Sequence, residues 1–274
     1  MSTAIDVPPE LLPSRKFLKN LGVFGGIFGF LVGAFIYQGT NPFMFFTEFH
    51  HVVNLFKDMV PLNVDLFSSE KLWASMIQTI SMAFLGTFGG GFLAFIMAFF
   101  AARNTAPNAF TRGLFRAFLA IQRVAPDYAI MLVIITTVGF GPFAGTIALI
   151  IGSTGMFGKF FADAIENVNP KPQESVRVLG ASKTQEIRYG IVPLVLPSFV
   201  ANGFFLLEIN VGAAIALGVY GGGGLGFHLN VAGDTLQYQD LLAYVVFILV
   251  MMICIERVSD RFRKRIFNKG ITLK

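Results

Sequence analysis

Apolar residues in this chain gather in long runs instead of the short alternating stretches of a soluble domain. Four runs carry no charged residue, and a fifth carries a single glutamate. In chain order the runs occupy residues 21–37, 72–102, 128–158, 194–219 and 241–255. A helix needs about twenty apolar residues to cross the hydrocarbon core of a bilayer. The pattern therefore predicts an all-α integral membrane protein.

Two of these runs are too long for one straight span. At a rise of about 1.5 Å per residue, the run at 72–102 would extend about 46 Å, so it must tilt, protrude or bend, and the triplet Gly89–Gly91 is the natural place for a bend. The run at 128–158 contains the sequence Gly-Phe-Gly-Pro at 139–142, which is typical of a turn. We therefore expect a helical hairpin there and six transmembrane helices in total.

The charged residues between the runs set the predicted orientation. Of the 21 Lys and Arg residues, all but Lys57 and Lys71 lie in four segments, at residues 15–19, 103–127, 159–193 and 256–274. By the positive-inside rule these segments face the cytoplasm, so both termini lie inside. With 54% hydrophobic and 14% charged residues, the composition argues against a soluble enzyme. The formal net charge of +5 then reflects orientation, and no nucleic-acid partner is expected.

The chain is expected to have two parts. Residues 1–70 hold the first transmembrane helix and an external amphipathic loop, whose aromatic side chains favour the membrane surface. Residues 71–274 form the transmembrane domain, which includes a patterned cytoplasmic loop at about 163–193. The basic stretch at 261–265 is expected to meet anionic lipid.

The cytoplasmic loop is patterned as two short helices. Gly180 favours the end of the first helix in a left-handed cap, and Ser182 with Gln185 three residues later is a capping-box pattern that starts the second. The prolines expected to open and close the two helices are Pro170, Pro172, Pro193 and Pro197. The pattern predicts a small projection from the membrane domain, with an ordinary amphipathic loop as the alternative.

This loop resembles the coupling-helix signature of ABC importer permeases, in which a Glu-Ala-Ala motif precedes a glycine and a later Ile-x-Leu-Pro. The matching positions are Glu174, Ser175, Gly180, Ala181, Ser182, Pro193 and Pro197. Ser175 and Val176 replace the two alanines but keep a small or apolar character. In that family the loop docks into a cleft on a cytoplasmic ATP-hydrolysing subunit, so these residues are expected to form the ATPase-coupling loop.

Three further stretches resemble the phosphonate/phosphite-type permeases within that family. They occupy residues 138–145, 155–160 and 208–226, so the resemblance extends over roughly residues 75–265. Relatives carry arginine at two positions of the fifth span where this chain has Leu206 and Gly212. Because an anionic phosphonate favours cationic partners, these two differences leave the exact substrate open.

The resemblance implies a type I importer-like fold and a permease subunit that moves such anions across a bacterial inner membrane by alternating access. The implied partners are two cytoplasmic ABC ATPase subunits, a second permease copy in a homodimer, a periplasmic substrate-binding protein and membrane lipid. ATP and Mg²⁺ would be held by the ATPases. This chain itself is expected to hold no cofactor, metal or catalytic residue.

Two alternatives stay open. An importer for another small solute, such as an amino acid or an oxyanion, would share the coupling loop. A secondary transporter that works without an ATPase is disfavoured by the patterned loop and by the lack of internal repeats.

Glu208 lies midway along the fifth span, where a carboxylate is costly unless it is paired or faces water. It is interpreted as a residue of the translocation path or gate, together with Asn210; the alternative is a carboxylate bonded to Asn202, Asn210 or a neighbouring helix. The glycines after this span suit either a moving gate or a plain tight turn. They are Gly221, Gly222, Gly223, Gly224 and Gly226.

Two other features are interpreted as structural. Arg123 and Asp127 are four residues apart and are expected to pair along one helix face. His50 and His51 have no companion ligands at a metal-binding spacing, so no metal site is expected there.

Overall fold

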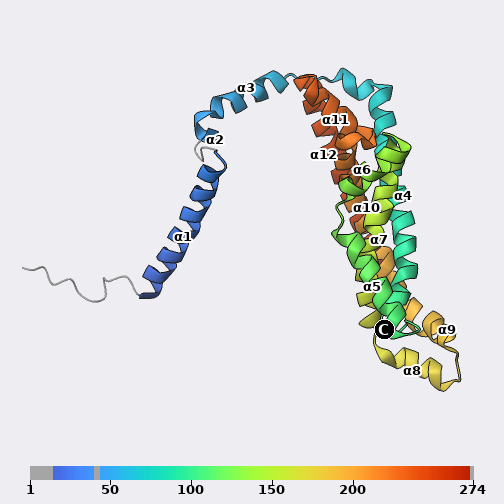
Figure 1. The fold of residues 1–274 in the computed structure, drawn as a ribbon. Coiled ribbons are helices and arrows are strands. Elements are labelled where there is room, and N and C mark those ends of the chain that lie inside the picture. The colour runs from blue at the N-terminus through green and yellow to red at the C-terminus, as the bar shows by residue number, and fades with distance from the viewer. Residues whose placement is uncertain (1–14, 40–43, 272–274) are drawn as a thin grey trace, which may run out of the picture. The chain divides into compact units, whose positions relative to one another are not determined.

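The computed structural model describes residues 15–39 and 44–271 (Figure 1). Over these ranges the chain forms helices joined by turns, and no strand occurs among the described residues. The chain separates into two compact units, Met1–Asp58 and Met59–Lys274. The predicted all-α architecture is confirmed.

The described residues of the first unit form three helices. They are α1 (Arg15–Tyr37), α2 (Met44–Thr47) and α3 (Phe49–Met59). The part of α1 from Lys19 to Tyr37 is long and apolar enough to cross a membrane. On α3, Phe49, Val53 and Phe56 recur at the spacing that puts side chains on one helix face. This unit therefore combines a candidate span with a short amphipathic helix.

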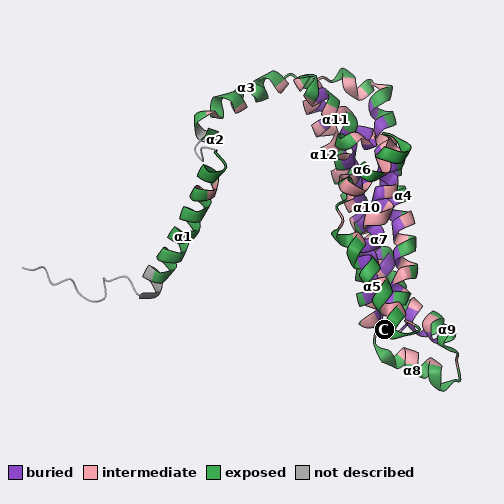
Figure 2. Ribbon diagram, in the orientation of Figure 1, coloured by how far each residue is buried: buried purple, intermediate pink, exposed green. Residues whose placement is uncertain are grey.

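The second unit is a helix bundle with a small projection at one end (Figure 1). After a 3₁₀ turn at Asp65–Ser68, its elements are α4 (Glu70–Ala101), α5 (Ala109–Val124), α6 (Asp127–Val138), α7 (Pro142–Glu166), α8 (Pro170–Val178), α9 (Lys183–Gln185), a π-helical segment (Glu186–Ile191), α10 (Val192–Leu217), a π-helical turn (Gly218–Gly222), α11 (Gly224–Asp234) and α12 (Tyr238–Ile271). The long helices α4, α7, α10 and α12 pack lengthwise. Buried residues lie mainly on their inner faces (Figure 2).

Within the described residues, five candidate spans and one bent helix pair follow the six predicted spans in order. Five are single helices or continuous helical stretches: α1, α4, α7, α9 through α10, and α12. The sixth is the pair α5 and α6, which together are apolar enough to cross but bend by 89° at their junction. The predicted hairpin is also present. Its turn holds Gly139 at φ +92° and Gly141 at φ +145°, conformations that favour glycine.

The predicted bend at Gly89–Gly91 is wrong, because α4 continues through the glycines as one helix. The glycines serve a packing role instead. A Cβ added at Gly86 would lie 2.7 Å from the Cβ of Leu149, and one at Gly90 would lie 2.5 Å from the Cβ of Ser153. Small residues let two membrane helices approach closely, so these positions hold α4 against α7.

The two prolines expected to end the short helix after Ser182 do not end it. The chain runs from α9 through the π-helical segment directly into α10. Pro193 lies in the first turn of α10 and Pro197 lies inside that helix. In a first turn the missing N–H of proline removes no helical hydrogen bond, so Pro193 starts a helix here.

The predicted pair between Arg123 and Asp127 is also wrong. Pro126 separates the two residues, since α5 ends at Val124 and α6 begins at Asp127 after the 89° bend. Among the described residues, no ion pair joins them within 4.0 Å. Asp127 instead places its Oδ1 where a Cβ at Gly152 of α7 would stand.

Candidate functional site

The projection at one end of the second unit consists of α8 and the turn that follows it (Figure 1). Asn169 caps the helix, because its side-chain oxygen accepts a hydrogen bond from the Lys171 N–H at 3.1 Å. Gly180 adopts the predicted left-handed conformation, with φ +84°. At the tip, the side chains of Val178 and Leu179 are 87% and 86% exposed. The projection therefore presents two bare apolar residues on a short, capped helix.

Glu186 holds this projection onto the bundle. Its carboxylate accepts hydrogen bonds from Nε of Arg177 at 2.6 Å and from Nη2 of Arg177 at 3.2 Å. Nε2 of Gln173 adds a third at 3.3 Å, and Nζ of Lys183 lies 3.6 Å away. The Glu186 side chain is only 5% exposed, so these partners replace most of its contact with water.

The environment of Glu186 changes its acidity. Glu186 lies in the charged segment at 159–193, before the apolar run that begins at Leu194, and so at the charged end of the continuous helical stretch Lys183–Gly222. The hydrogen bond from Arg177 is the largest cause that lowers the pKa of Glu186, to about 2, with help from Gln173 and the positive charge of Lys183. The carboxylate is therefore charged at every physiological pH.

The base of the projection is connected to three other helices. A Cβ at Gly190 would lie 2.9 Å from the Cα of Gln173, so α8 lies directly against the π-helical segment. Nζ of Lys183 donates to the carbonyl of Asn104 at 3.0 Å, and Nδ2 of Asn104 donates to the carbonyl of Ile165 at 2.8 Å. These contacts link the base of the projection to the segment after α4, to α7 and to the start of α10.

The residues predicted for the coupling loop all lie on or beside this projection, except the two prolines inside α10. Glu174 is exposed, and the Ser175 hydroxyl donates to the carbonyl of Lys171 at 2.9 Å. The capping box of Ser182 and Gln185 is present, with the Ser182 N–H donating to Oε1 of Gln185 at 2.8 Å. Ala181 lies between this box and Gly180, half-buried.

Sequence reasoning missed Glu186 and Arg177 as a pair. They lie nine residues apart, on opposite sides of the Gly180 turn. No helical or strand periodicity links such positions. Only the close approach at Gly190, seen in three dimensions, brings them together.

Asn210 joins three helices inside the bundle. Its side chain is almost fully buried, and Nδ2 donates to Oγ1 of Thr87 on α4 and to Oγ of Ser153 on α7, both at 2.9 Å. Polar contacts of this kind hold membrane helices together. Asn210 also lines a cavity between α6, α7 and α10. It therefore connects the helices and borders that cavity.

Glu208, two residues before Asn210 on α10, lies near a basic residue of α12. Its Oε2 is 3.6 Å from Nη2 of Arg263. Asn210 is occupied by the contacts just described, and Nδ2 of Asn202 donates to the carbonyl of Ser198 at 2.8 Å. Of the alternatives raised by the sequence, the structure places Glu208 against a neighbouring helix.

The glycine run after α10 forms a tight reversal into α11. Gly221, Gly223 and Gly224 all have positive φ, at +98°, +78° and +69°. The Gly224 N–H donates to Oε1 of Gln78 at 2.7 Å, and the Leu225 N–H donates to Oγ1 of Thr79 at 2.9 Å. The Gly141 N–H of the hairpin turn donates to the carbonyl of Gly221 at 3.1 Å. The tight turn is thus present, and a gating role stays a prediction.

The remaining two glycines of the run have different surroundings. Gly226 faces the carbonyl of Ile215, which occupies the space of its missing Cβ. A Cβ added at Gly222 would lie 2.9 Å from the carbonyl oxygen of Leu217. Both positions therefore require a residue without a side chain for the reversal to close.

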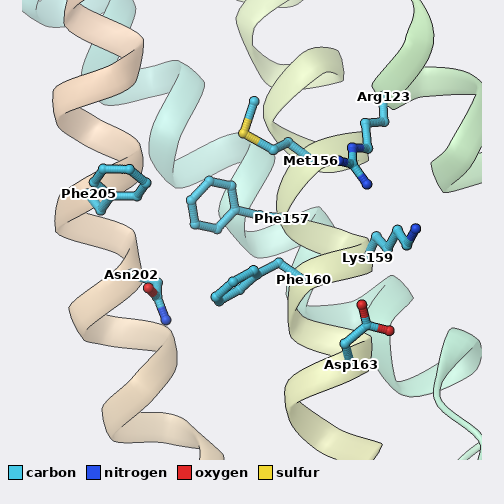
Figure 3. A pocket seen from close by; sticks show the side chains of 8 residues that line it. All are labelled: Arg123, Met156, Phe157, Lys159, Phe160, Asp163, Asn202 and Phe205. Atoms are coloured by element: carbon cyan, nitrogen blue, oxygen red, sulfur yellow. The ribbon is translucent and has the colours of Figure 1, made fainter. Parts of the chain in front are cut away.

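Two adjoining cavities lie between α5, α6, α7 and α10. The smaller, of about 190 Å³, includes Asp127, Ser153 and Asn210 in its wall. The larger, of about 280 Å³, is shown in Figure 3. Its lining residues are Arg123, Met156, Phe157, Lys159, Phe160, Asp163, Asn202 and Phe205. Arg123 and Met156 line both cavities, so the two cavities lie next to each other along α7.

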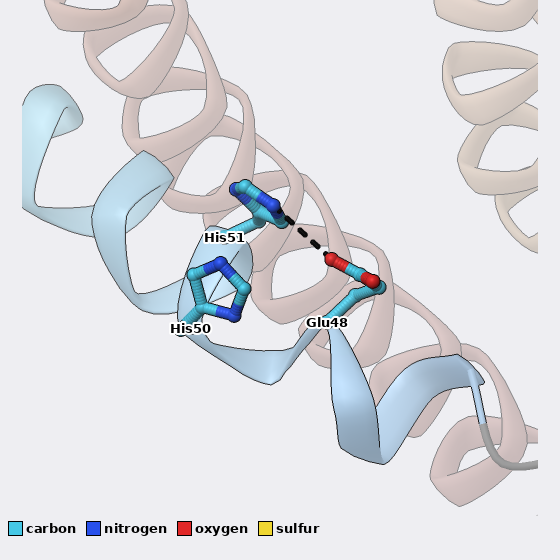
Figure 4. A group of neighbouring side chains, drawn as sticks. All are labelled: Glu48, His50 and His51. Carbon is cyan, nitrogen blue, oxygen red and sulfur yellow. Dashed lines mark ion pairs between the residues drawn. The ribbon is translucent and has the colours of Figure 1, made fainter.

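A small cluster in the first unit brings potential metal ligands together. Ligand atoms of Glu48, His50 and His51 all lie within 4.8 Å of one another, and Nε2 of His51 is 3.1 Å from Oε2 of Glu48 (Figure 4). The cluster is solvent-facing, with the side chains of His51 and Glu48 68% and 47% exposed. That no metal site is formed here stays a prediction.

Residues 90–269 match the model of the family described as "binding-protein-dependent transport system inner membrane component". The chain belongs to this family. The matched range of this inner membrane component includes α8, Glu186, Asn210 and both cavities, and it leaves out α1, α2 and α3.

Curated relatives are more specific in their names. The component is 32% identical over 259 residues to the phosphate-import permease protein PhnE of Mycolicibacterium smegmatis, a match that covers 94% of this chain and 48% of the relative. The chain thus spans about half the length of that protein. It is 37% identical over 191 residues to the putative phosphite transport system permease protein HtxC of Stutzerimonas stutzeri, covering 70% of this chain and 68% of the relative.

A solved structure shows the same fold. The permease chain of a MetNI methionine ABC transporter, in an inward-facing conformation, aligns with a TM-score of 0.63 at 20% identity, covering 72% of this chain and 99% of that chain. The family and the type I importer-like fold expected from the coupling-loop motif are therefore confirmed.

Proposed function

We propose that this chain is the membrane-spanning permease subunit of an ATP-driven importer for phosphonate- or phosphite-type anions in a bacterial inner membrane. Its family membership supports a transport role, and the names of the relatives PhnE and HtxC support a phosphorus oxyanion as substrate. Substrate is delivered by a periplasmic binding protein and crosses by alternating access. The chain acts as a transport subunit and performs no catalysis itself.

The proposed orientation follows from charge. The end of the bundle that carries α8 also carries Arg103, Arg112 and Arg116, together with the basic part of α12. Such clusters stay on the cytoplasmic side. Both termini and the projection then face the cytoplasm, and the glycine turn before α11 faces the periplasm.

The observation that carries the proposal is the shape and anchoring of α8. Val178 and Leu179 present exposed apolar surface at its tip, while Glu186 and Arg177 fix its base. Exposed apolar patches on a rigid support are typical of protein contact sites. We assign this tip to the cleft of an ATPase subunit, with ATP and Mg²⁺ held by that partner.

The full assembly would contain two permease copies and two ATPase subunits, with one projection for each ATPase. The second copy would cover part of the apolar surface of α4, α10 and α12, and lipid would cover the rest. The stoichiometry follows from the importer architecture and is part of the proposal.

The docking assignment is tested by co-purification with the ATPase subunits. Leu179→Glu places a charge at the tip and should reduce recovery of the ATPase at least tenfold. Leu236→Asn is the matched control, since Leu236 is also a well exposed apolar residue (65%) but lies between α11 and α12. Equal recovery with Leu179→Glu and wild type would contradict the assignment.

The substrate class is tested separately, with the cognate periplasmic binding protein. Tight binding of phosphite or methylphosphonate supports the proposal. Tight binding of an amino acid or another oxyanion, with none of either phosphorus compound, would replace the substrate and leave the ATP-driven permease role intact.

A further inference from the structure

We infer that Arg123 and Lys159 form a binding site for the transported anion in the 280 Å³ cavity between α5, α7 and α10. The inference deepens the proposed function and rests on it. The site would hold a phosphorus oxyanion between the two cationic side chains, which Figure 3 shows on the same side of α7.

The first support is that both cations are uncommitted. Within the described ranges, neither Arg123 nor Lys159 has a carboxylate within 4.0 Å or a side-chain hydrogen bond. Two other basic residues of the bundle are paired instead: Arg116 with Glu166 at 2.7 Å and Arg177 with Glu186 at 2.6 Å. The charge of Arg123 and Lys159 is therefore available to a ligand.

The second support is the charge balance of the cavity wall. Its one acidic residue, Asp163, has Oδ1 4.0 Å from Nη2 of Arg116, which pairs more closely with Glu166 at 2.7 Å. The wall thus has two cations and a single acid, and that acid lies near a third cation. Such a surface attracts an anion and disfavours a cationic solute.

The third support is the chemistry of the rest of the wall. Met156, Phe157, Phe160 and Phe205 form the apolar part of the wall. Arg123 and Lys159 are both exposed, so an anion can reach them. A volume of about 280 Å³ is at the small end of ligand sites and suits a small anion.

The local sequence explains why the two cations share this cavity. A Cβ at Gly155 of α7 would lie 2.6 Å from the backbone nitrogen of Arg123, so α5 rests directly on α7 at this point. Lys159 follows Gly155 by one helical turn and lies on the same face. Arg123 also stands in the last turn of α5, where a positive charge is favoured by the helix dipole.

A lipid headgroup carries the same phosphorus-oxyanion chemistry as the substrate. The test therefore uses the complete transporter, with its ATPase subunits and binding protein, in proteoliposomes with and without phosphatidylglycerol. Uptake of phosphite and of methylphosphonate is measured for wild type, Arg123→Gln, Lys159→Gln and the double variant. Arg112→Gln is the matched control, because Arg112 lies on the same helix and lines neither cavity.

The expected result is a loss of uptake of at least tenfold in the double variant, in both lipid mixtures. Arg123→Lys and Lys159→Arg should restore most of it. ATP hydrolysis stimulated by the binding protein should persist in all variants, because the cations act on the substrate and not on α8. Arg112→Gln should transport like wild type.

Three outcomes would overturn the site. The first is wild-type uptake by the double variant. The second is a defect seen only with phosphatidylglycerol, which would assign the cations to lipid. The third is an equal loss in the charge-conserving variants, which would indicate a packing role. If wild type itself transports neither compound, the proposed substrate class fails, and that result is separate from these three.

Discussion

Nη2 of Arg263 on α12 lies 3.6 Å from Oε2 of Glu208 on α10. This pair accounts for a carboxylate placed midway along an apolar helix. Arg263 is shared, because it also pairs with Asp260 at 2.5 Å and lies over the ring of Phe205, 5.7 Å from its centroid. A basic residue close to the C-terminus thus neutralises an acidic residue of the fifth candidate span.

Glu208 and Arg263 should therefore be energetically coupled. Arg263→Gln leaves Glu208 without its cation in a poorly hydrated place, and Glu208→Gln leaves Arg263 with Asp260 as its remaining acidic partner. The double variant removes both charges. Its loss of unfolding free energy should be about 1 kcal/mol smaller than the sum of the losses in the two single variants. Thermal unfolding in detergent measures this cycle. Strict additivity would show that the pair contributes nothing.

Glu186 should control how firmly α8 is attached. Glu186→Gln keeps the shape of the side chain but weakens the two hydrogen bonds from Arg177. We expect at least tenfold faster amide hydrogen exchange in residues 170–178, with the spans unaffected. Glu174→Gln, an exposed residue of the same helix, is the control. Unchanged exchange in Glu186→Gln would show that α8 is held by other contacts.

The attachment of α8 should resist mild acid. Because the pKa of Glu186 is lowered to about 2 in the folded protein, its contribution is fully present above the ordinary carboxyl pKa of about 4.3 and is lost only as the pH falls towards 2. Exchange in 170–178, corrected for the intrinsic pH dependence of amide exchange, should stay constant between pH 8 and pH 5. Release of α8 within that range would contradict the role of this carboxylate.

The glycines of α4 should differ in their tolerance of a side chain. Gly90→Ala places a Cβ 2.5 Å from Ser153 and should destabilise the protein by about 1–3 kcal/mol. Gly91→Ala meets nothing within 4 Å and should be neutral or stabilising, since alanine favours the helix. Thermal unfolding of the two variants compares the same substitution at adjacent positions. Equal changes in stability for the two variants would show that Gly90 is not needed for the close contact between α4 and α7.

The chain pattern predicted the elements of this fold well, because run length, turn glycines and capping residues act locally. The hairpin turn at 139–141 and the left-handed Gly180 are examples. Errors arose where a local signal had two outcomes. Glycines in a helix can allow a bend or allow a second helix to pack closely. In α4, Gly89 and Gly90 allow α7 to pack closely. Proline can end a helix or begin one, and Pro193 begins α10.

The site was less predictable because its contacts join distant parts of the chain. Asn210 meets Thr87 across 123 positions, and Glu186 meets Arg177 across a turn. The cavity residues Arg123 and Lys159 lie on different helices, and only the glycine contact at Gly155 brings them together. The polar residues were visible in the sequence, but their partners were not.

ATP-dependent uptake into proteoliposomes tests the central claim most directly. Phosphite accumulation should require the ATPase subunits, the binding protein and ATP, and it should fall at least tenfold in Glu174→Lys and Gly180→Trp, which alter the projection. Uptake by this chain alone, without an ATPase, or full ATP-driven uptake by both variants, would contradict an ATP-driven permease coupled through α8.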